Sequence, residues 1–267
     1  MRPVRNERHC EPGEMLTLCA RCSRDSQAGE RGGPNQDHVA IVSDATMDGS
    51  TLLIVADGLG GYDRGDVASR MVCEELPELY YARLTEDSCR KSLHQAVTAL
   101  NSRLYDSSQG AEPSTRMCTT VAAAAIQGRS AEIIHVGDSK AFLFRAGKLL
   151  YQSEDHCVRL RDFERESGAS QSPRYLTQAI GARASVQPAQ ISMSLEEGDV
   201  LLLCSDGVSD VCSPEEMISL IAAEESFDAE QLVKLAQKKG AIDDVSCVIA
   251  RISSLEPTTQ DSPATHK

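Results

Sequence analysis

The stretch Leu52-Leu-Ile-Val-Ala-Asp-Gly-Leu-Gly-Gly61 joins five apolar residues to an aspartate, Asp57, and a glycine-rich turn. A short apolar run that ends at turn residues predicts a buried strand. The glycines after Asp57 let the backbone turn sharply and approach other groups closely. A carboxylate at the edge of an apolar core costs free energy unless something neutralises it. The stretch therefore predicts a core strand that places Asp57 where a positive charge is needed.

An aspartate also stands at one end of four further apolar runs. These are Asp37 before 39–42, Asp138 after 133–136, Asp206 after 200–204, and Asp243 with Asp244 before 245–250. Asp and Gly often only mark turns, so a single junction of this kind says nothing about function. Strands that share sheets can bring their ends together, and clustered carboxylates repel one another unless cations lie between them. Oxygen ligands without paired Cys or His favour Mg²⁺ or Mn²⁺ over zinc, so the pattern predicts such a metal site.

Apolar runs and turn residues predict a mixture of strands and helices. Strands are expected at 15–22, 39–42, 52–56, 119–126, 131–136, 141–144, 200–204 and 245–251. Hairpin turns at 128–130 and 146–148 indicate antiparallel pairing. Apolar faces and capping residues predict helices at 87–107, after Ser213, and from Asp228 to Gly240. Strands and helices that do not alternate strictly are typical of an α+β fold.

Residues 1–253 are expected to form a single domain, because the 267 residues suffice for one sizeable core and contain no repeat. The polar stretch 254–267 is expected to be a disordered tail. A formal net charge of -13 argues against a nucleic-acid partner, and no run approaches the ~20 apolar residues that span a bilayer. The ten cysteines lie mostly in apolar runs, and no apolar signal segment follows the N-terminus. We therefore expect a cytoplasmic protein.

Eight short motifs follow one another along the chain. They are Asn35-Gln36-Asp37, Asp57-Gly-Leu-Gly-Gly61, Thr119-Thr120, Gly137-Asp138-Ser139, Asp155-His156, Leu176-Thr-Gln-Ala-Ile-Gly181, Ser205-Asp206-Gly207 and Asp243-Asp244-Val-Ser246. Each motif is weak alone, but the ordered set resembles the PP2C-type (PPM family) protein phosphatases from about Leu16 to Ile252. The short length, the Asn-Gln-Asp motif and Leu59 in the glycine turn are most similar to the bacterial branch.

The resemblance implies a sandwich of two antiparallel β-sheets flanked by helices (α-β-β-α), with two Mg²⁺ or Mn²⁺ ions at one end. Asp57 would bridge the two metals, and the Gly58 carbonyl would bind one of them. Asp37 would act on that same side, directly or through water, and Asp206 and Asp243 would hold the other metal. These four aspartates would thus be both the catalytic and the metal-binding carboxylates.

Two further roles follow from the resemblance. Asp138, with Asp206, would match the acidic residues that hold a third, weaker metal in bacterial members. Family members also grip the substrate phosphate with an arginine five residues before the last Asp of the Asn-Gln-Asp motif. Gly32 stands at that place, and a one-residue insertion in the turn would give the role to Arg31.

The sequence also bears on the leaving-group acid, on a loop beside the active site and on two cysteines. Leu59 replaces a histidine of eukaryotic members, so water or His38 would protonate the leaving group, although we interpret His38 mainly as a packing or hydrogen-bonding residue. The charged stretch 157–175 falls where the family has a flap beside the active site. We interpret Cys118 and Cys204 as core residues, because no Cys-x5-Arg loop supports a cysteine nucleophile.

The function that the resemblance implies is hydrolysis of phosphoserine or phosphothreonine in proteins by a water that bridges two metals. Phosphorylated proteins would be the substrates, a Ser/Thr kinase would be the counterpart, and the chain is expected to be a monomer. Two alternatives stay open: a non-catalytic member of the fold that binds a phosphoprotein, and a two-metal hydrolase of another phosphoester. The four retained aspartates argue against the first alternative, and the scarcity of aromatic residues for base stacking argues against the second.

Overall fold

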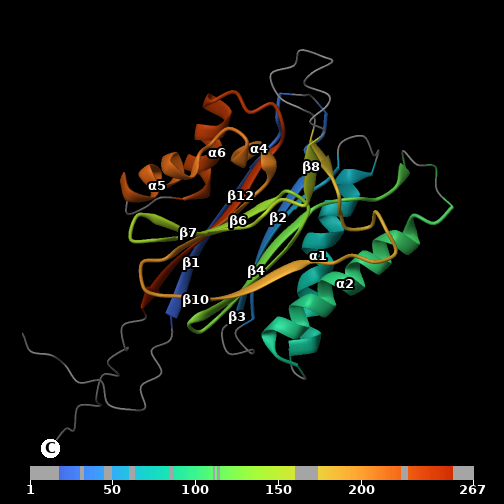
Figure 1. The fold of residues 1–267 in the computed structure, drawn as a ribbon, viewed down its shortest axis with the longest axis horizontal. Helices are drawn as coiled ribbons and strands as arrows, with labels where there is room; N and C mark the ends of the chain where they lie inside the picture. The colour runs from blue at the N-terminus through green and yellow to red at the C-terminus, as the bar shows by residue number, and fades with distance from the viewer. Residues whose placement is uncertain are drawn as a thin grey trace, which may run out of the picture.

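The computed structural model of the chain describes residues 18–30, 33–44, 50–59, 64–84, 87–110, 112, 115–159, 174–223 and 228–254. Two five-stranded antiparallel sheets pack face to face, and helices cover both outer sides (Figure 1). This arrangement is the α+β sandwich that the sequence predicts. Residues 255–267 of the expected tail lie outside the described residues.

The first sheet contains the strands from the two ends of the described chain. Its order is β1 (Leu18–Gln27), β12 (Val245–Ser254), β11 (Val200–Cys204), β6 (Lys140–Arg145) and β7 (Lys148–Gln152). Its outer face is covered by α4 (Asp206–Ser209), α5 (Pro214–Ala223) and α6 (Ala229–Lys238). The expected caps are present, because Ser213 and Glu216 form a reciprocal capping box, and Asp228 forms another with Gln231.

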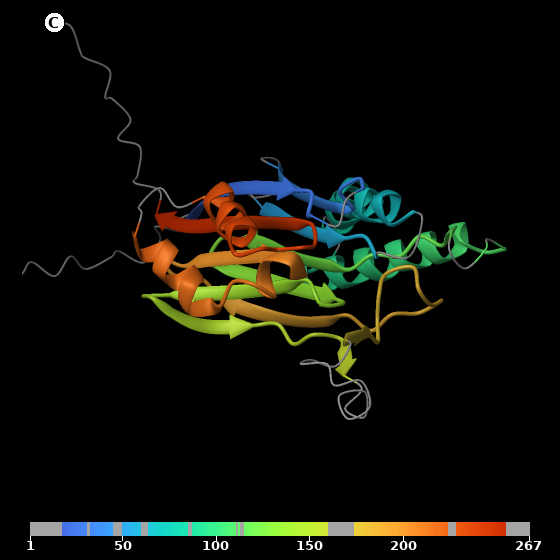
Figure 2. The same ribbon diagram turned by 90° about the horizontal axis from the view of Figure 1, so that it is seen from above.

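The second sheet carries the two longest helices. Its order is β10 (Ala189–Ser194), β5 (Ser130–Val136), β4 (Val121–Gln127), β3 (Ser50–Asp57) and β2 (Asp37–Asp44). Helices α1 (Gly65–Leu84) and α2 (Cys89–Ser107) cover its outer face (Figure 1). A separate ribbon of β8 (Cys157–Arg159) and β9 (Arg174–Leu176) projects from the sandwich (Figure 2).

Each central strand is buried on both of its faces. Along β3, Leu53 and Val55 pack between the two sheets, whereas Leu52 and Ile54 pack under α1 and α2. Alternate residues of a strand point to opposite faces, so a strand covered on both sides needs apolar residues at every position. The sequence therefore shows continuous apolar runs rather than alternation, and the two faces together anchor the strand ends rigidly.

The strands predicted from apolar runs are all present, with differences in extent and number. Strand β1 continues to Gln27 instead of ending at Cys22, because its ten residues pair with the whole of β12. The sequence patterns also predict no helix at 65–84, where α1 lies, and no strand for β7 to β10. Helix α1 includes Pro77, and the strands from β7 to β10 are short or partly exposed, so their local signals are weak.

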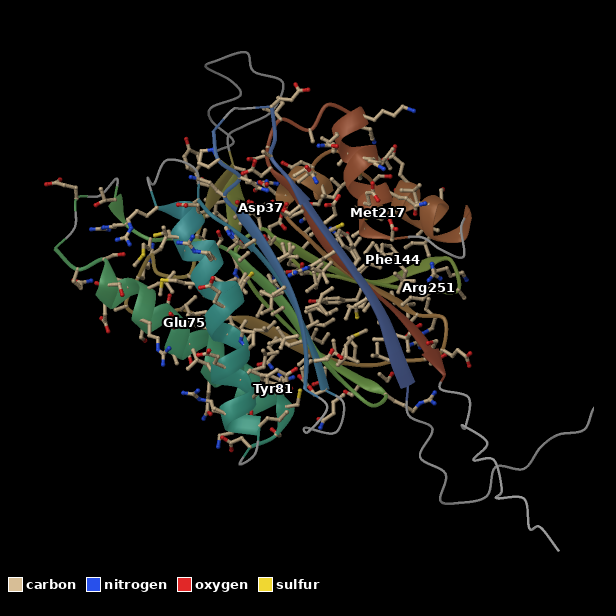
Figure 3. The ribbon with its side chains drawn as sticks, turned by 180° about the vertical axis from the view of Figure 1, so that it is seen from behind. Asp37, Glu75, Tyr81, Phe144, Met217 and Arg251 are labelled. Atoms are coloured by element: carbon tan, nitrogen blue, oxygen red, sulfur yellow. The ribbon has the colours of Figure 1, made fainter. Side chains whose placement is uncertain are left out.

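The loops at one end of the sandwich hold the predicted site. Figure 3 shows Asp37 at that end and Tyr81 towards the opposite end. Within the described residues, every helix is too short or too polar to cross a membrane.

Candidate active site

The two aspartates of the second sheet are direct neighbours. Asp37 begins β2 and Asp57 ends β3, and the antiparallel register pairs them across the two strands. Side chains directly opposite each other in such a pair lie about 4.5–5.5 Å apart at their Cβ atoms, and like charges there are unfavourable. The fold therefore forces two carboxylates together at the end of an apolar core.

The first sheet and β5 bring three more aspartates to the same end. Asp206 follows β11 and opens α4, Asp243 precedes β12, and Asp138 follows β5. A cavity of about 280 Å³ is lined by Gly33, Pro34, Gln36, Asp57, Gly58, Leu59, Asp138, Leu176, Asp206, Asp243 and Asp244. The prediction that these strand ends converge is confirmed in the described chain. Asp37 does not line the cavity, since its side chain is buried.

Burial and mutual repulsion make these carboxyl groups weak acids. Burial raises the pKa of Asp37 to about 7, and Asp244 and Asp243 add to the rise. Burial also raises the pKa of Asp206 to about 7, with contributions from the charges of Asp138 and Asp243. The pKa of Asp57 lies well above its usual value, because of burial and then of the nearby Asp37 and Asp206 charges. The cluster is thus short of positive charge.

The donor set fits a hard divalent cation. Within the described residues, both carboxylate oxygens of Asp37 and the Oδ1 atom of Asp206 are buried without a hydrogen-bond donor. An orphaned buried acceptor is costly, and all the acceptors here are oxygens, which Mg²⁺ and Mn²⁺ prefer. Among the described residues, no group of three or more His, Cys, Asp or Glu side chains is already positioned to coordinate a metal ion. The fit therefore rests on the orphaned oxygens and on the chemistry of the donors.

The backbone of the Asp57 turn is fixed by the Thr119-Thr120 motif. The Asp57 carbonyl accepts hydrogen bonds from the Thr119 hydroxyl and the Thr120 amide, both at 2.8 Å. The Asp57 amide donates to the Thr120 hydroxyl at 3.0 Å. A Cβ atom on Gly58 would lie 2.4 Å from the Gly65 carbonyl, so only glycine fits at this close approach. These contacts hold Asp57 in one position.

The contacts of two residues at the site are not predicted from the sequence, although one of them, Asp244, belongs to the last of the eight motifs. The Arg174 guanidinium bridges Asp206 and Asp138, with Nη2–Oδ2 distances of 2.8 Å and 3.3 Å. The Asp244 carboxylate accepts hydrogen bonds from the amides of Gly29 and Gln36, each at 2.8 Å, and so ties the loop before β2 to the loop before β12. Arg174 lies at the end of the charged stretch 157–175, where sequence spacing gives no signal for a contact with Asp206.

The remaining predicted residues have the following places. Arg31 lies outside the described residues. His38 Nδ1 is 3.0 Å from the Ser69 hydroxyl, which agrees with a local hydrogen-bonding role. Cys118 and Cys204 are buried, and burial raises the pKa of both thiols, which makes them poor nucleophiles.

A wider groove adjoins the cavity. It has a volume of about 1070 Å³ and shares Leu59, Asp138, Leu176, Asp206 and Asp243 with the cavity. Tyr175 and Ile242 line it and are 49% and 61% exposed. The carboxylate cluster therefore lies at the bottom of an open surface rather than in a closed pocket.

Comparison with known proteins gives one family. The family model described as Protein phosphatase 2C matches residues 26–240. The serine/threonine protein phosphatase PstP of Mycobacterium tuberculosis is 31% identical over 243 residues, which cover 89% of this chain and 46% of that protein. The protein phosphatase PhpP of Streptococcus pneumoniae is 26% identical over 238 residues, which cover 85% of this chain and 96% of PhpP.

A solved structure agrees in fold. The PstP catalytic domain in complex with two manganese ions matches with a TM-score of 0.72 and 29% identity, over 89% of this chain and 100% of that domain. The family model spans Asp37, Asp57, Asp138 and Asp206 of the carboxylate cluster and ends shortly before Asp243. The chain belongs to the protein phosphatase 2C family.

Proposed function

We propose that this chain hydrolyses phosphoserine and phosphothreonine in proteins with the help of two divalent cations. The observation that carries the proposal is the set of buried and half-buried carboxylates that converge from both sheets, with orphaned oxygens on Asp37 and Asp206. Arg174 neutralises part of the charge of Asp206 and Asp138, but it leaves Asp206 Oδ1 and both Asp37 oxygens without a donor among the described residues. PstP, which is named a serine/threonine protein phosphatase, supports the choice of substrate class.

The proposed roles follow the position of each residue. Asp57 would contact both cations, and the Gly58 carbonyl and Asp37 would complete the side that faces the second sheet. Asp206 and Asp243 would hold the cation on the side of the first sheet. Mg²⁺ and Mn²⁺ both suit these oxygen ligands, and the PstP structure supports Mn²⁺ as the first ion to test.

The chemistry requires positive charge and an activated water. When bound, paired divalent cations neutralise phosphoryl oxygens and bring the pKa of a water molecule close to neutrality. The protein contributes a fixed geometry, because Thr119 and Thr120 hold the Asp57 backbone at two points. It also buries Asp37, so that bulk water does not compete with a cation for the oxygens of this carboxylate.

The open groove beside the cluster supports a protein as the substrate. A groove of about 1070 Å³ can hold several residues of a peptide on either side of the phosphorylated one. The exposed Tyr175 and Ile242 offer apolar contacts to such residues. Arg31 remains our prediction for the phosphate-binding residue.

We also propose a kinase partner, an oligomeric state and a cellular compartment for this chain. A Ser/Thr kinase would supply the phosphorylated proteins, and the chain would act as a monomer. The eight described free cysteines favour a reducing compartment such as the cytoplasm.

One assay tests the proposed function. Purified protein should hydrolyse p-nitrophenyl phosphate and a phosphothreonine peptide in Mn²⁺, and should lose this activity in EDTA. Asp87→Asn serves as a matched control, since Asp87 pairs with Lys91 at the start of α2, away from the cluster. Turnover that persists in EDTA would contradict the proposal, and so would a nucleotide preferred over the peptide by orders of magnitude. Tight Mn²⁺ binding without any turnover would favour a binding protein instead.

Gly58→Ala tests the role of the turn. The added Cβ would collide with the Gly65 backbone at 2.4 Å, so the turn must move and the Gly58 carbonyl with it. We expect a destabilisation of about 1–3 kcal/mol and a loss of most of the increase in melting temperature that Mn²⁺ causes. Gly147→Ala, in the β6–β7 hairpin, also strains the backbone because its φ is +71°. It should lower the melting temperature but leave the Mn²⁺-dependent increase intact, and an equal loss in both variants would remove the special role of Gly58.

A further inference from the structure

Arg174 is the cation that faces the carboxylate cluster in the described structure. Its Nη2 atom lies 2.8 Å from Asp206 Oδ2 and 3.3 Å from Asp138 Oδ2. The side chain is only 19% exposed, and the Asp138 side chain is 9% exposed. The arginine therefore pairs with the two carboxylates at a site that is largely shielded from solvent, where ion pairs are stronger than at the surface.

A third carboxylate fixes the position of this arginine. Asp210 accepts hydrogen bonds from Nη1 at 2.8 Å and from Nη2 at 3.1 Å. Asp210 follows Asp206 by one helical turn, at the end of α4, and its amide donates to the Asp206 carbonyl at 2.8 Å. The two-pronged contact suits the planar guanidinium, which a lysine would not reproduce. Asp210 thus holds Arg174 against Asp206.

The same two carboxylates are those for which the sequence resemblance implies a third, weaker metal. A divalent cation placed against the Oδ2 atoms of Asp138 and Asp206 would lie in the space that the guanidinium occupies, and the two positive charges would repel each other at that distance. Either cation neutralises the pair, and the arginine is always present at high local concentration because it belongs to the chain.

We propose that Arg174 is a built-in cation of the Asp138–Asp206 pair, held by Asp210, and that it competes with a divalent cation for this place. The inference rests on the proposed function, since it assumes that the cluster binds metal. The chain would then work with two tightly bound cations, and a third would bind only by displacing the guanidinium. Coupling between two sites of a protein typically changes affinity about 5- to 150-fold, so a similar change is expected when the competitor is removed.

Metal titration of the full chain tests the proposal. Mn²⁺ binding would be measured by isothermal titration calorimetry and by the electron paramagnetic resonance signal of free Mn²⁺, for wild type, Arg174→Ala, Asp210→Asn and Arg183→Ala. We expect Arg174→Ala to tighten the weakest Mn²⁺ site about tenfold or more, or to add one site to those measurable. Asp210→Asn keeps the arginine but loosens its anchor, so it should give a smaller change in the same direction. Arg183 lines the same groove and is exposed, so Arg183→Ala controls for the general loss of positive charge.

A second variant assigns the effect to the carboxylate pair. Adding Asp138→Asn to Arg174→Ala should abolish the gain in affinity, because the vacated place then lacks one of its two carboxylates. Circular dichroism of each variant shows whether it is folded, and Asp210→Asn keeps the test decisive should Arg174→Ala fail to fold.

The outcomes separate this inference from the proposed function. If Arg174→Ala binds Mn²⁺ as wild type does, or more weakly, the inference is wrong, even though wild type still hydrolyses the phosphopeptide with Mn²⁺. A change of equal size in Arg183→Ala would also overturn it, since the effect would then be one of overall charge. If wild type neither binds Mn²⁺ nor turns over, both the proposed function and this inference are wrong, since the inference requires a cluster that binds metal.

Discussion

Asp57→Asn is expected to abolish Mn²⁺-dependent hydrolysis of p-nitrophenyl phosphate and, at the same time, to make the EDTA-treated protein more stable. The loss of activity should reach roughly a thousandfold or more, the scale on which removal of a group that organises transition-state charge acts. The gain in stability has a separate cause. Burial and the charges of Asp37 and Asp206 raise the pKa of Asp57 well above its usual value, so that its ionisation at pH 8 opposes folding.

The asparagine side chain removes that charge and adds an amide that can donate to the neighbouring carboxylates. We expect the free energy of unfolding at pH 8 in EDTA to rise by roughly 1–3 kcal/mol. Urea denaturation measures the free energy of unfolding. Circular dichroism is the probe of choice, because the chain has no Trp for fluorescence. Asp87→Asn is the control and should change neither quantity by much. A variant with wild-type activity, or one that is destabilised in EDTA, would contradict the proposed place of Asp57.

The stability of the EDTA-treated protein should fall as the pH rises from about 4 to about 7. The pKa values of Asp37 and Asp206 are raised from 3.8 to about 7 in the folded chain, mainly by burial. The unfolded chain loses these protons near pH 4, whereas the folded chain keeps them until near pH 7. Stability from these groups is thus complete below pH 4 and is lost as the pH passes through 7. One to two protons correspond to about 1.4–2.7 kcal/mol per pH unit within that window.

Mn²⁺ should reverse this dependence, because metal binding requires the ionised carboxylates. At a hundredfold excess over its dissociation constant, each bound ion adds about 2.7 kcal/mol to the free energy of unfolding. Two ions would then raise the melting temperature of a domain of this size by roughly 10–20 °C at pH 8. The increase should shrink as the pH falls below 7. Thermal melts between pH 5 and pH 8, with Mn²⁺ or EDTA, measure both effects, and equal profiles in the two conditions would contradict the prediction.

The sequence predicts the centre of this fold better than its edges. Strand β11 lies at the predicted residues 200–204, because its five residues are buried on both faces and leave a continuous apolar signal. Helix α1 is not predicted from the sequence, although it packs closely on β2 and β3. The predicted hairpin turns at 128–130 and 146–148 are confirmed, because turn chemistry acts over neighbouring residues.

The candidate site likewise contains residues that local sequence patterns predict and contacts that they do not predict. Asp57 and Asp206 stand beside strong strand signals, so the sequence alone predicts their places. The contact between Arg174 and Asp206 joins residues 32 positions apart through a loop, and no local pattern encodes it. The same is true of Asp244, whose carboxylate reaches Gln36 across 208 positions. Long-range polar contacts of this kind depend on the register of the sheets.

The pairing of β1 with β12 joins Leu18 to Ser254, almost the full described length of the chain. A ribosome makes the N-terminal end first, so β1 has no partner strand until β12 has been made. Asp243 is likewise made after the other aspartates of the carboxylate cluster, which is incomplete until Asp243 emerges. A nascent chain therefore cannot act on phosphoproteins early in its synthesis. The topology makes synthesis of β12 a condition for activity, with no need for an inhibitory segment.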